Sequence, residues 1–241
     1  VVHSKASMIH KMPGDEWQRF ANLRVLYCYM FTHPGTKLLF QGCEFAQTSE
    51  WNFTKGLDWD LLQYEFHKGI QRLIKDLNTL YRGEPALYVK QFDWEGFEWI
   101  DHSDNKNSVY VYIRHSEDPM DDIIVVCNMT PIPLRNYSVG IPNKGKLKEI
   151  FNSDAKLYGG TGDFSNKPFS TKKEPAHFRD FSAEIVIPPL GMVAFKYTEM
   201  SKKPVSRSKE KAISKKDVTK SIQKLKKKQN KIPLLKKAPK K

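Results

Sequence analysis

The sequence predicts an α/β region followed by an all-β region. Two stretches, roughly residues 15–32 and 65–82, carry apolar residues at helical spacing, and an apolar run at 37–41 between them has the length of a buried strand. From about residue 87 the apolar period shortens from 3.6 toward 2, and turn residues separate the short runs. The first region is therefore typical of one unit of an α/β barrel, and the second of an antiparallel β-sandwich.

The first helix is expected to run from a cap at Asp15 to about Thr32. Aspartate is a favourable N-cap residue, and its carboxylate interacts well with the positive end of the helix dipole. Apolar positions become denser toward the C-terminal half, so we expect that half to be buried. Pro34 and Gly35 then end the helix. The preceding residues 1–14 are predicted to form a polar loop.

Residues 33–60 contain the strand and the loop that matter most for function. Residues 37–41 are predicted to form a short buried strand that ends at Gly42. In α/β barrels, the loops after the strand C-termini form the active face. Aromatic rings beside carboxylates and amides suit sugars, which stack on rings and hydrogen-bond through their hydroxyls. The loop after residue 41 has this composition, with Glu44, Gln47, Glu50, Trp51, Asn52, Asp58, Trp59 and Asp60.

The second helix is expected from about Glu65 to Arg82 and should pack on the outside of the barrel. Gly83 and Pro85 end it. Its apolar residues form one stripe at i, i+4, i+7, i+8, i+11, i+14 and i+15, namely Phe66, Ile70, Leu73, Ile74, Leu77, Leu80 and Tyr81.

Seven strands are predicted in the all-β region, which is expected to be an antiparallel sandwich. Aspartate, asparagine and proline clusters separate most of them. Tyr158 and the glycine-rich residues 159–162 are predicted to form an irregular loop. The seven strands span residues 97–101, 108–114, 123–129, 137–141, 147–151, 183–187 and 192–197.

The basic charge of the chain is concentrated in its last 41 residues. Residues 201–241 hold 16 lysines and Arg207 against Glu210 and Asp217, a net charge of +15, so residues 1–200 carry −2 of the total +13. Apolar content there is too low to offset the entropy of ordering, so we predict a disordered tail. Clustered lysines can bind nucleic acid or an anionic membrane surface, but without interleaved aromatics we favour a solubilising extension.

The three cysteines, Cys28, Cys43 and Cys127, indicate buried thiols and not a disulfide framework or a metal site. No CxxC spacing occurs, and nothing in the sequence implies a metal or a cofactor. This cysteine usage favours a reducing, cytoplasmic location. No apolar run has the length needed to span a bilayer.

Several motifs resemble the glycogen (1,4-α-glucan) branching enzymes of the α-amylase superfamily. The central one is GxEFxQ at 42–47, followed by EWN at 50–52 and LDW at 57–59. KMPGD at 11–15 and FANLR at 20–24 precede it, and EPAL at 84–87 and FEWI at 97–100 follow it. The resemblance extends from Val1 to about Tyr197 and implies that residues 37–41 form the last strand of a (β/α)₈ barrel.

The resemblance also implies what the chain lacks. Family members use an Asp nucleophile, a Glu acid/base and a second Asp, and the last of these precedes a Val-Val-His like Val1-Val2-His3. No catalytic residue is therefore expected in this chain, which should be the C-terminal part of a longer enzyme and inactive alone. We predict three parts: residues 1–86, the end of the barrel; residues 87–199, a β-sandwich; and residues 200–241, the lysine-rich tail.

Six residues are candidates for contact with an α-glucan substrate: His3, Glu44, Trp51, Asn52, Asp58 and Trp59. All of them except Asp58 have a structural alternative. His3 is either a group behind the substrate contacts or a plain surface histidine. Glu44 either binds sugar hydroxyls or anchors its loop by accepting hydrogen bonds. The tryptophans either stack on sugars or fill space beneath the loop, and Asn52 either binds sugar or caps a turn.

The partners expected are an α-glucan such as glycogen or amylose and the missing N-terminal part of the same enzyme. Two alternative functions remain open. One is a non-catalytic glucan-binding module, and the other is part of an amylase-type hydrolase or debranching enzyme, because the terminal sandwich is shared across the superfamily.

Overall fold

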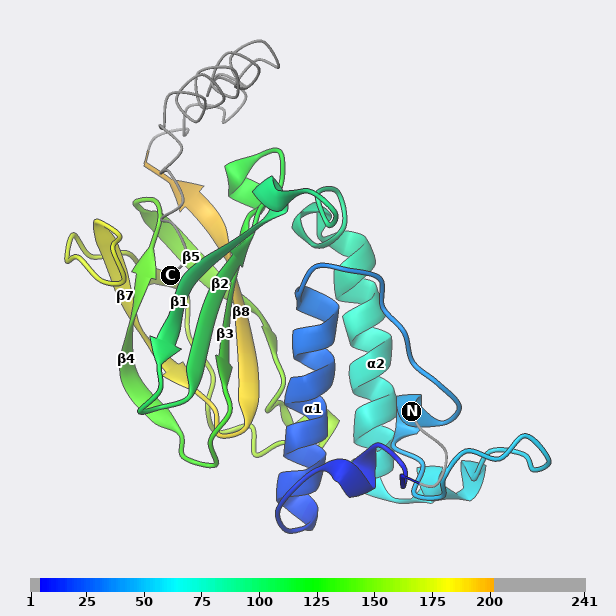
Figure 1. Ribbon diagram of the computed structural model, residues 1–241. Coiled ribbons are helices and arrows are strands. Elements are labelled where there is room, and N and C mark those ends of the chain that lie inside the picture. Colours follow the sequence, from blue (N-terminus) through cyan, green and yellow to red (C-terminus); the bar gives the residue numbers. More distant parts are fainter. Residues whose placement is uncertain (1–4, 202–241) are drawn as a thin grey trace, which may run out of the picture. The chain divides into compact units, whose positions relative to one another are not determined.

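The computed structural model describes residues 5–201, and its helices and strands follow the predicted order (Figure 1). The predictions for His3 and for residues 202–241 lie outside these residues. Short 3₁₀-helices occur at Ile9–Lys11, Cys43–Phe45, Trp59–Gln63, Pro85–Leu87, Trp94–Gly96, Pro119–Asp121 and Lys156–Tyr158. The helices and strands are α1 (Glu16–Thr32), α2 (Glu65–Gly83), β1 (Phe97–Asp104), β2 (Val109–Arg114), β3 (Ile123–Asn128), β4 (Leu134–Ile141), β5 (Gly145–Asn152), β6 (Phe169–Ser170), β7 (Phe181–Ile187) and β8 (Gly191–Met200).

Helix α1 begins at the predicted cap. The Asp15 carboxylate accepts a hydrogen bond from the backbone N–H of Gln18 at 2.8 Å, and the Gln18 side chain accepts one from the N–H of Asp15 at 3.1 Å. This reciprocal capping box satisfies two N–H groups that the helix itself leaves unpaired. Burial extends from Phe20 to Thr32, which confirms the buried C-terminal half and continues it toward the start of the helix.

Helix α2 confirms the predicted stripe. Ile70, Leu73, Ile74 and Leu77 are buried and share one apolar core with α1. Among the described residues, this face packs on α1 and on the 3₁₀ turns at Cys43–Phe45 and Lys156–Tyr158.

The strands form an antiparallel sandwich, as predicted. The larger sheet has six strands in the order β1-β2-β3-β8-β5-β6, and the smaller sheet pairs β4 with β7. All seven predicted strands occur within a few residues of their expected bounds. Strand β6 was not predicted, because two residues are too few to show an alternating pattern.

The six-stranded sheet has an apolar core on each of its faces, and Figure 1 shows α1 and α2 on one side of it and β4 and β7 on the other. Strand β3 shows why. Ile123, Val125 and Cys127 belong to the core shared with the helices, whereas Ile124 and Val126 belong to the core shared with β4 and β7. Alternate residues of a strand point to opposite faces, so an uninterrupted apolar strand is required where both faces are covered.

The structure forms no strand at residues 37–41 within the described residues, and the expected place of this segment in a barrel stays a prediction. The segment pairs with no strand among residues 5–201, and Leu38 is 77% exposed. Lys37 turns back, and its ammonium group donates to the carbonyl oxygen of His33 at 2.5 Å. A strand needs a neighbour for its backbone groups, and no described segment supplies one here.

A buried arginine on β2 joins the helices to the sheet. Arg114 is fully buried, and its guanidinium donates to the carbonyl oxygens of Thr32 at 2.6 Å, Leu87 at 3.2 Å and Gly96 at 3.2 Å. These carbonyls lie at the end of α1, just beyond α2 and just before β1. Burial lowers the pKa of Arg114 to about 10, so the group keeps its proton at neutral pH.

The glycine-rich loop after Tyr158 is irregular, as predicted, but it is docked on both helices. Arg24 of α1 donates to the carbonyl oxygen of Gly159 at 3.2 Å, and the Tyr158 hydroxyl donates to Asp76 of α2 at 3.0 Å. Gly69 of α2 lies so close that a Cβ atom there would stand 2.6 Å from the Tyr158 carbonyl. The loop therefore fixes the helix pair to the sandwich.

Within residues 5–201, none of the helices is long and apolar enough to cross a membrane.

Candidate functional site

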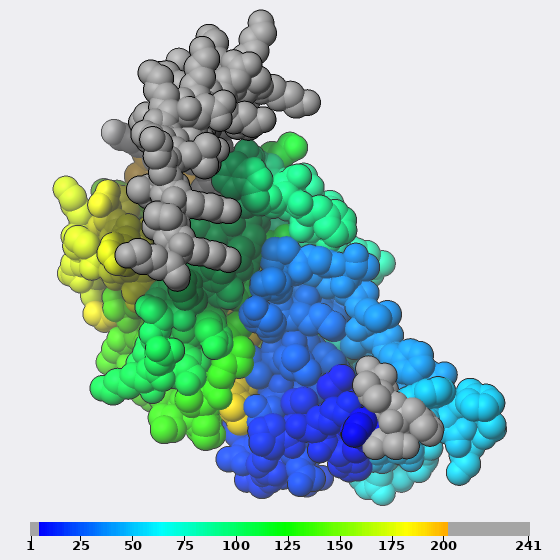
Figure 2. Space-filling model, in the orientation of Figure 1, coloured from blue at the N-terminus to red at the C-terminus, as the bar shows by residue number. Residues whose placement is uncertain are grey.

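The loop between α1 and α2 holds all the candidate site residues that the structure describes. Figure 2 shows its outer part, in cyan, projecting from the body of the protein. Its base is the turn Cys43–Phe45, flanked by Gly42 and Ala46 in left-handed conformations with φ of 78° and 59°. Residues in this conformation allow the chain to reverse direction tightly. Glu44 is the middle residue of the resulting turn.

Two side chains from the helices hold this turn. The Tyr27 hydroxyl donates to the carbonyl oxygen of Cys43 at 2.8 Å, and His67 Nδ1 lies 2.9 Å from the carbonyl oxygen of Phe45. Burial raises the pKa of the Tyr27 hydroxyl, and the Cys43 and Glu44 side chains raise it further. Burial also raises the pKa of the Cys43 thiol. Both groups therefore stay protonated at neutral pH.

The Glu44 and Asp58 carboxylates are available to a ligand. Both side chains are partly exposed, and within residues 5–201 neither accepts a hydrogen bond nor forms an ion pair. The anchoring alternative for Glu44 is therefore not fulfilled by any described residue. Instead the loop is anchored by Gln47, whose side chain bonds to the backbone of Asp58.

Trp59 packs on one aromatic ring and is otherwise exposed. Its ring lies on the buried ring of Phe45 with a centroid separation of 4.9 Å and an interplanar angle of 30°, while 54% of the residue is exposed. One face of the indole is thus supported by protein and the residue remains open to solvent. This is the arrangement expected of a platform for an apolar sugar face.

Trp51 and Asn52 are placed differently. Trp51 is half-buried and packs edge-on against Phe40 at 5.7 Å, which favours the space-filling alternative for it. The Asn52 side-chain oxygen accepts from the Thr54 N–H at 2.9 Å and from the Thr54 hydroxyl at 2.7 Å. Asn52 thus caps this turn, which favours the turn-capping alternative, and the residue as a whole is exposed.

The surface of this loop is shallow. A hollow lined by residues including Met8, Phe40, Gln41 and Trp51 encloses about 10 Å³, which is room for one water molecule. A ligand would therefore lie along the exposed side chains. Among the described residues, no group of three or more His, Cys, Asp or Glu side chains is placed to hold a metal ion.

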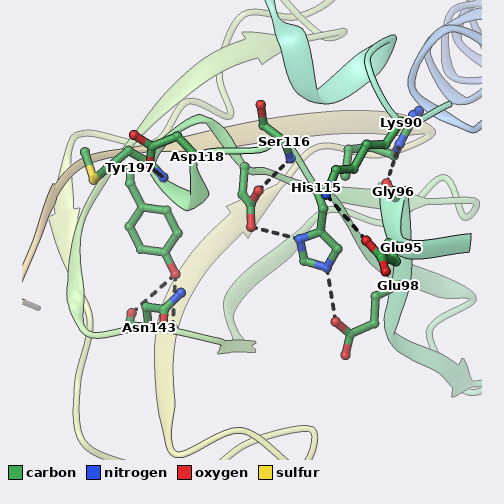
Figure 3. Close-up of polar contacts among 12 residues, drawn as sticks. Lys90, Glu95, Gly96, Glu98, His115, Ser116, Asp118, Asn143 and Tyr197 are labelled. Carbon is green, nitrogen blue, oxygen red and sulfur yellow. Dashed lines mark hydrogen bonds and ion pairs between the residues drawn. The ribbon is translucent and has the colours of Figure 1, made fainter. Parts of the chain in front are cut away.

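The structure contains a polar cluster that was not predicted (Figure 3). His115 Nδ1 lies 2.8 Å from a carboxylate oxygen of Asp122, and its Nε2 lies 3.2 Å from one of Glu98. Asp122 also accepts from the N–H of Ser116 at 2.8 Å, and Glu98 pairs with Arg179. Burial opposes the charge on Glu98, but hydrogen bonds from Arg179 and His115 outweigh it and lower the pKa of that carboxyl.

A histidine between two carboxylates has the composition of an acid–base site, but its polar groups are occupied by one another. The His115 side chain is only 3% exposed, and both of its nitrogens face protein oxygens. The cluster ties β1, β2 and the turn before β3 together, so its role is structural. The sequence signal was weak, because these residues come together only through the pairing of β2 with both β1 and β3.

Comparisons with known proteins agree with this arrangement. A family profile described as "Alpha amylase, C-terminal all-beta domain" matches residues 99–198, the sandwich. The 1,4-alpha-glucan branching enzyme GlgB of Thermosynechococcus vestitus is 52% identical over 198 residues, covering 81% of this chain and 26% of the relative. The enzyme of the same name from Aquifex aeolicus is 50% identical over 197 residues, covering 82% and 31%.

Solved structures show the same fold at low sequence identity. Isomaltulose synthase from Klebsiella sp. LX3 matches with a TM-score of 0.52 and 15% identity, over 79% of this chain and 41% of that one. Ttha1563 from Thermus thermophilus matches with a TM-score of 0.53 and 17% identity, over 80% and 34%.

The chain spans about a quarter to a third of the length of the curated relatives it matches. It includes their all-β terminal domain, and about half of its aligned residues are identical to theirs. The chain therefore corresponds to the C-terminal portion of a 1,4-alpha-glucan branching enzyme of the α-amylase superfamily.

Proposed function

We propose that this chain belongs to an enzyme that cleaves an α-1,4 glucan and transfers the released segment to a 6-hydroxyl, making an α-1,6 branch. The observation that carries the proposal is the identity of about 50% with branching enzymes over nearly 200 residues, which include the exposed loop as well as the sandwich. Residues 1–86 would be the end of the catalytic barrel, with 37–41 as its last strand, and residues 87–199 the terminal domain.

The chemistry would be performed by carboxylates outside this chain, and the loop would bind and orient the glucan. The exposed Trp59 ring offers a stacking surface, and the Glu44 and Asp58 carboxylates can accept hydrogen bonds from sugar hydroxyls. Trp51 and Asn52 would flank this surface. Such contacts hold an acceptor or donor chain in place, which is how a binding wall contributes to rate.

We place the enzyme in the cytoplasm. The support is that Cys28, Cys43 and Cys127 are all free thiols, whereas secreted proteins commonly pair their cysteines in disulfides.

A chimera tests the proposal. In the Thermosynechococcus enzyme, the 198-residue segment that aligns with this chain would be replaced by this chain. We expect the chimera to branch amylose, seen as a shift of the iodine–amylose absorbance to shorter wavelength, with the intact relative as positive control. A chimera that folds but leaves the iodine spectrum unchanged would refute the proposal.

Trp59→Ala in this chimera tests the loop. Loss of one stacking contact of about 0.5–1.5 kcal/mol should raise KM for amylose up to about tenfold. Phe92→Ala is the matched control, because Phe92 is also a highly exposed aromatic residue but lies between α2 and β1. Equal effects of the two substitutions would contradict a binding role for Trp59.

A non-catalytic glucan-binding module remains the second candidate, favoured by the exposed loop, whose Glu44 and Asp58 carboxylates no described residue pairs. Strong retardation of residues 1–200 in a glycogen-containing gel, together with an inactive chimera, would select it.

A further inference from the structure

Gln47 lies at the base of the exposed loop and touches three of its segments. The residue is 7% exposed. Its side-chain oxygen accepts the backbone N–H of Asp58 at 3.0 Å, and its side-chain nitrogen donates to the carbonyl oxygen of Ser49 at 3.4 Å. Its own N–H donates to the carbonyl oxygen of Gly42 at 2.9 Å. Through its side-chain amide and its backbone N–H, this one buried residue connects the segments at Gly42, Ser49 and Asp58.

The backbone at Gly42 is shaped to accept this amide. A Cβ atom on Gly42 would stand 2.7 Å from both Cβ and Oε1 of Gln47, closer than such atoms approach. The φ angle of 78° at Gly42 also favours glycine. Gly42 and Gln47 therefore act as one unit, in which the glycine leaves the space that the glutamine side chain fills.

The hydrogen bond to Asp58 links two candidate sugar contacts that come from opposite ends of the loop. Glu44 and Phe45 lie on the turn at its start, and Asp58 and Trp59 lie 14 residues further on. Pinning the Asp58 backbone to Gln47 brings Trp59 onto Phe45, where their rings are 4.9 Å apart. Without the amide, closure of this loop would depend on the ring contact and would carry a larger entropy cost.

We infer that Gln47 is a positioning residue of the glucan-binding surface, which holds the Trp59 ring and the Asp58 carboxylate in register with Glu44. Gln47 does not itself touch substrate, because its polar atoms are engaged by the loop backbone. The inference rests on the proposed function and adds to it the residue that sets the geometry of the surface.

The test compares two variants of the full 241-residue chain by retardation in glycogen-containing gels. Gln47→Met conserves volume but removes both side-chain hydrogen bonds, and should weaken glycogen affinity about fivefold or more, the effect of about 1 kcal/mol. Asn166→Leu is the control. The Asn166 side chain, in the sandwich, accepts from the Val186 N–H at 2.7 Å and donates to the Val186 carbonyl oxygen at 2.8 Å. Removing these two bonds should lower stability but leave glycogen affinity within twofold of wild type.

A conservative variant sharpens the test. Gln47→Glu keeps an oxygen acceptor for the Asp58 N–H and should retain wild-type affinity within about threefold, while Gln47→Met should also speed hydrogen exchange at the Asp58 amide. In the chimera, Gln47→Met should raise KM for amylose about fivefold and leave kcat within twofold.

Several outcomes would overturn the inference: wild-type affinity in Gln47→Met, equal loss in Asn166→Leu, or loss in Gln47→Glu equal to that in Gln47→Met. Absence of retardation of the wild-type chain would also overturn it. None of these outcomes bears on whether the chimera branches amylose, so failure of the inference and failure of the proposed function are distinguishable.

Discussion

Apolar residues of the sandwich and of the loop between the helices differ in burial. In strand β3 every residue is buried, because the strand lies between two apolar cores. In the loop, Leu38, Phe53 and Trp59 are 77%, 83% and 54% exposed. Helices and sandwich together therefore bury β3, whereas no described part of the chain covers these three loop residues. Substitutions in the two regions should differ accordingly.

The largest effect is expected where the helices meet the sandwich. Arg114→Met removes a buried donor that serves three carbonyl oxygens, and each buried acceptor left unpaired costs about 1–3 kcal/mol. We expect the free energy of unfolding to fall by at least about 3 kcal/mol in denaturant titrations. A loss below about 1 kcal/mol would mean that these carbonyls find other partners.

An opposed pair of glycine substitutions on α2 should come next. Gly69→Ala places a methyl group against the Tyr158 carbonyl and should destabilise by about 1–3 kcal/mol despite the better helix propensity of alanine. Gly83→Ala, on the same helix, meets nothing within 4 Å and should stabilise by up to about 1 kcal/mol. The measurement is the change in Tm of each variant on thermal unfolding. If both variants shift Tm in the same direction, the loop at Tyr158 moves to accommodate the added methyl group.

Removing the Glu98 carboxylate, which contacts Arg179 and His115, should lower stability by a smaller amount that depends on pH. Because the pKa of Glu98 is lowered in the folded state, its contribution is fully present above its ordinary value of about 4.5 and is lost as pH falls through the lowered pKa. The difference in Tm between wild type and Glu98→Gln should therefore shrink between about pH 5 and pH 3. A difference that grows on acidification would contradict this assignment.

The smallest effect is expected in the exposed segment. Leu38→Ser should change the stability of the 241-residue chain by less than about 0.5 kcal/mol, because Leu38 is 77% exposed. In the chimera the same substitution should cost about 2 kcal/mol or more if residues 37–41 complete a barrel there. Equal Tm shifts in the two proteins would remove the barrel assignment of this segment.

The sequence correctly predicted the helices and strands that pack against other described parts of the chain. The Asp15 cap, the α2 stripe and the seven longer strands depend on local periodicity and on a core that the chain completes itself. Residues 37–41 have the same kind of pattern, but a strand also needs a neighbour, and pattern alone cannot supply it. The rule linking apolar runs to burial therefore failed only where the described residues offer no partner.

The candidate site was predicted in part for the same reason. Residue type made Trp59, Glu44 and Asp58 candidates, because aromatic rings and carboxylates in a loop can be read from composition, and the structure shows that all three are at least partly exposed. The bridge from Gln47 to Asp58 and the cluster around His115 depend on which side chains meet across 7 to 17 residues, and spacing does not encode that. Of the two tryptophans, only the structure distinguishes the supported platform from the packed ring.

Strand β3 has a further consequence for how the protein melts. Its side chains belong alternately to the helix core and to the sandwich core, so opening either core exposes one face of the same strand. The helix pair and the sandwich should therefore lose structure in a single cooperative step. A repacking substitution made in one core must likewise be tolerated by the other, which ties the evolution of the terminal domain to that of the two helices before it.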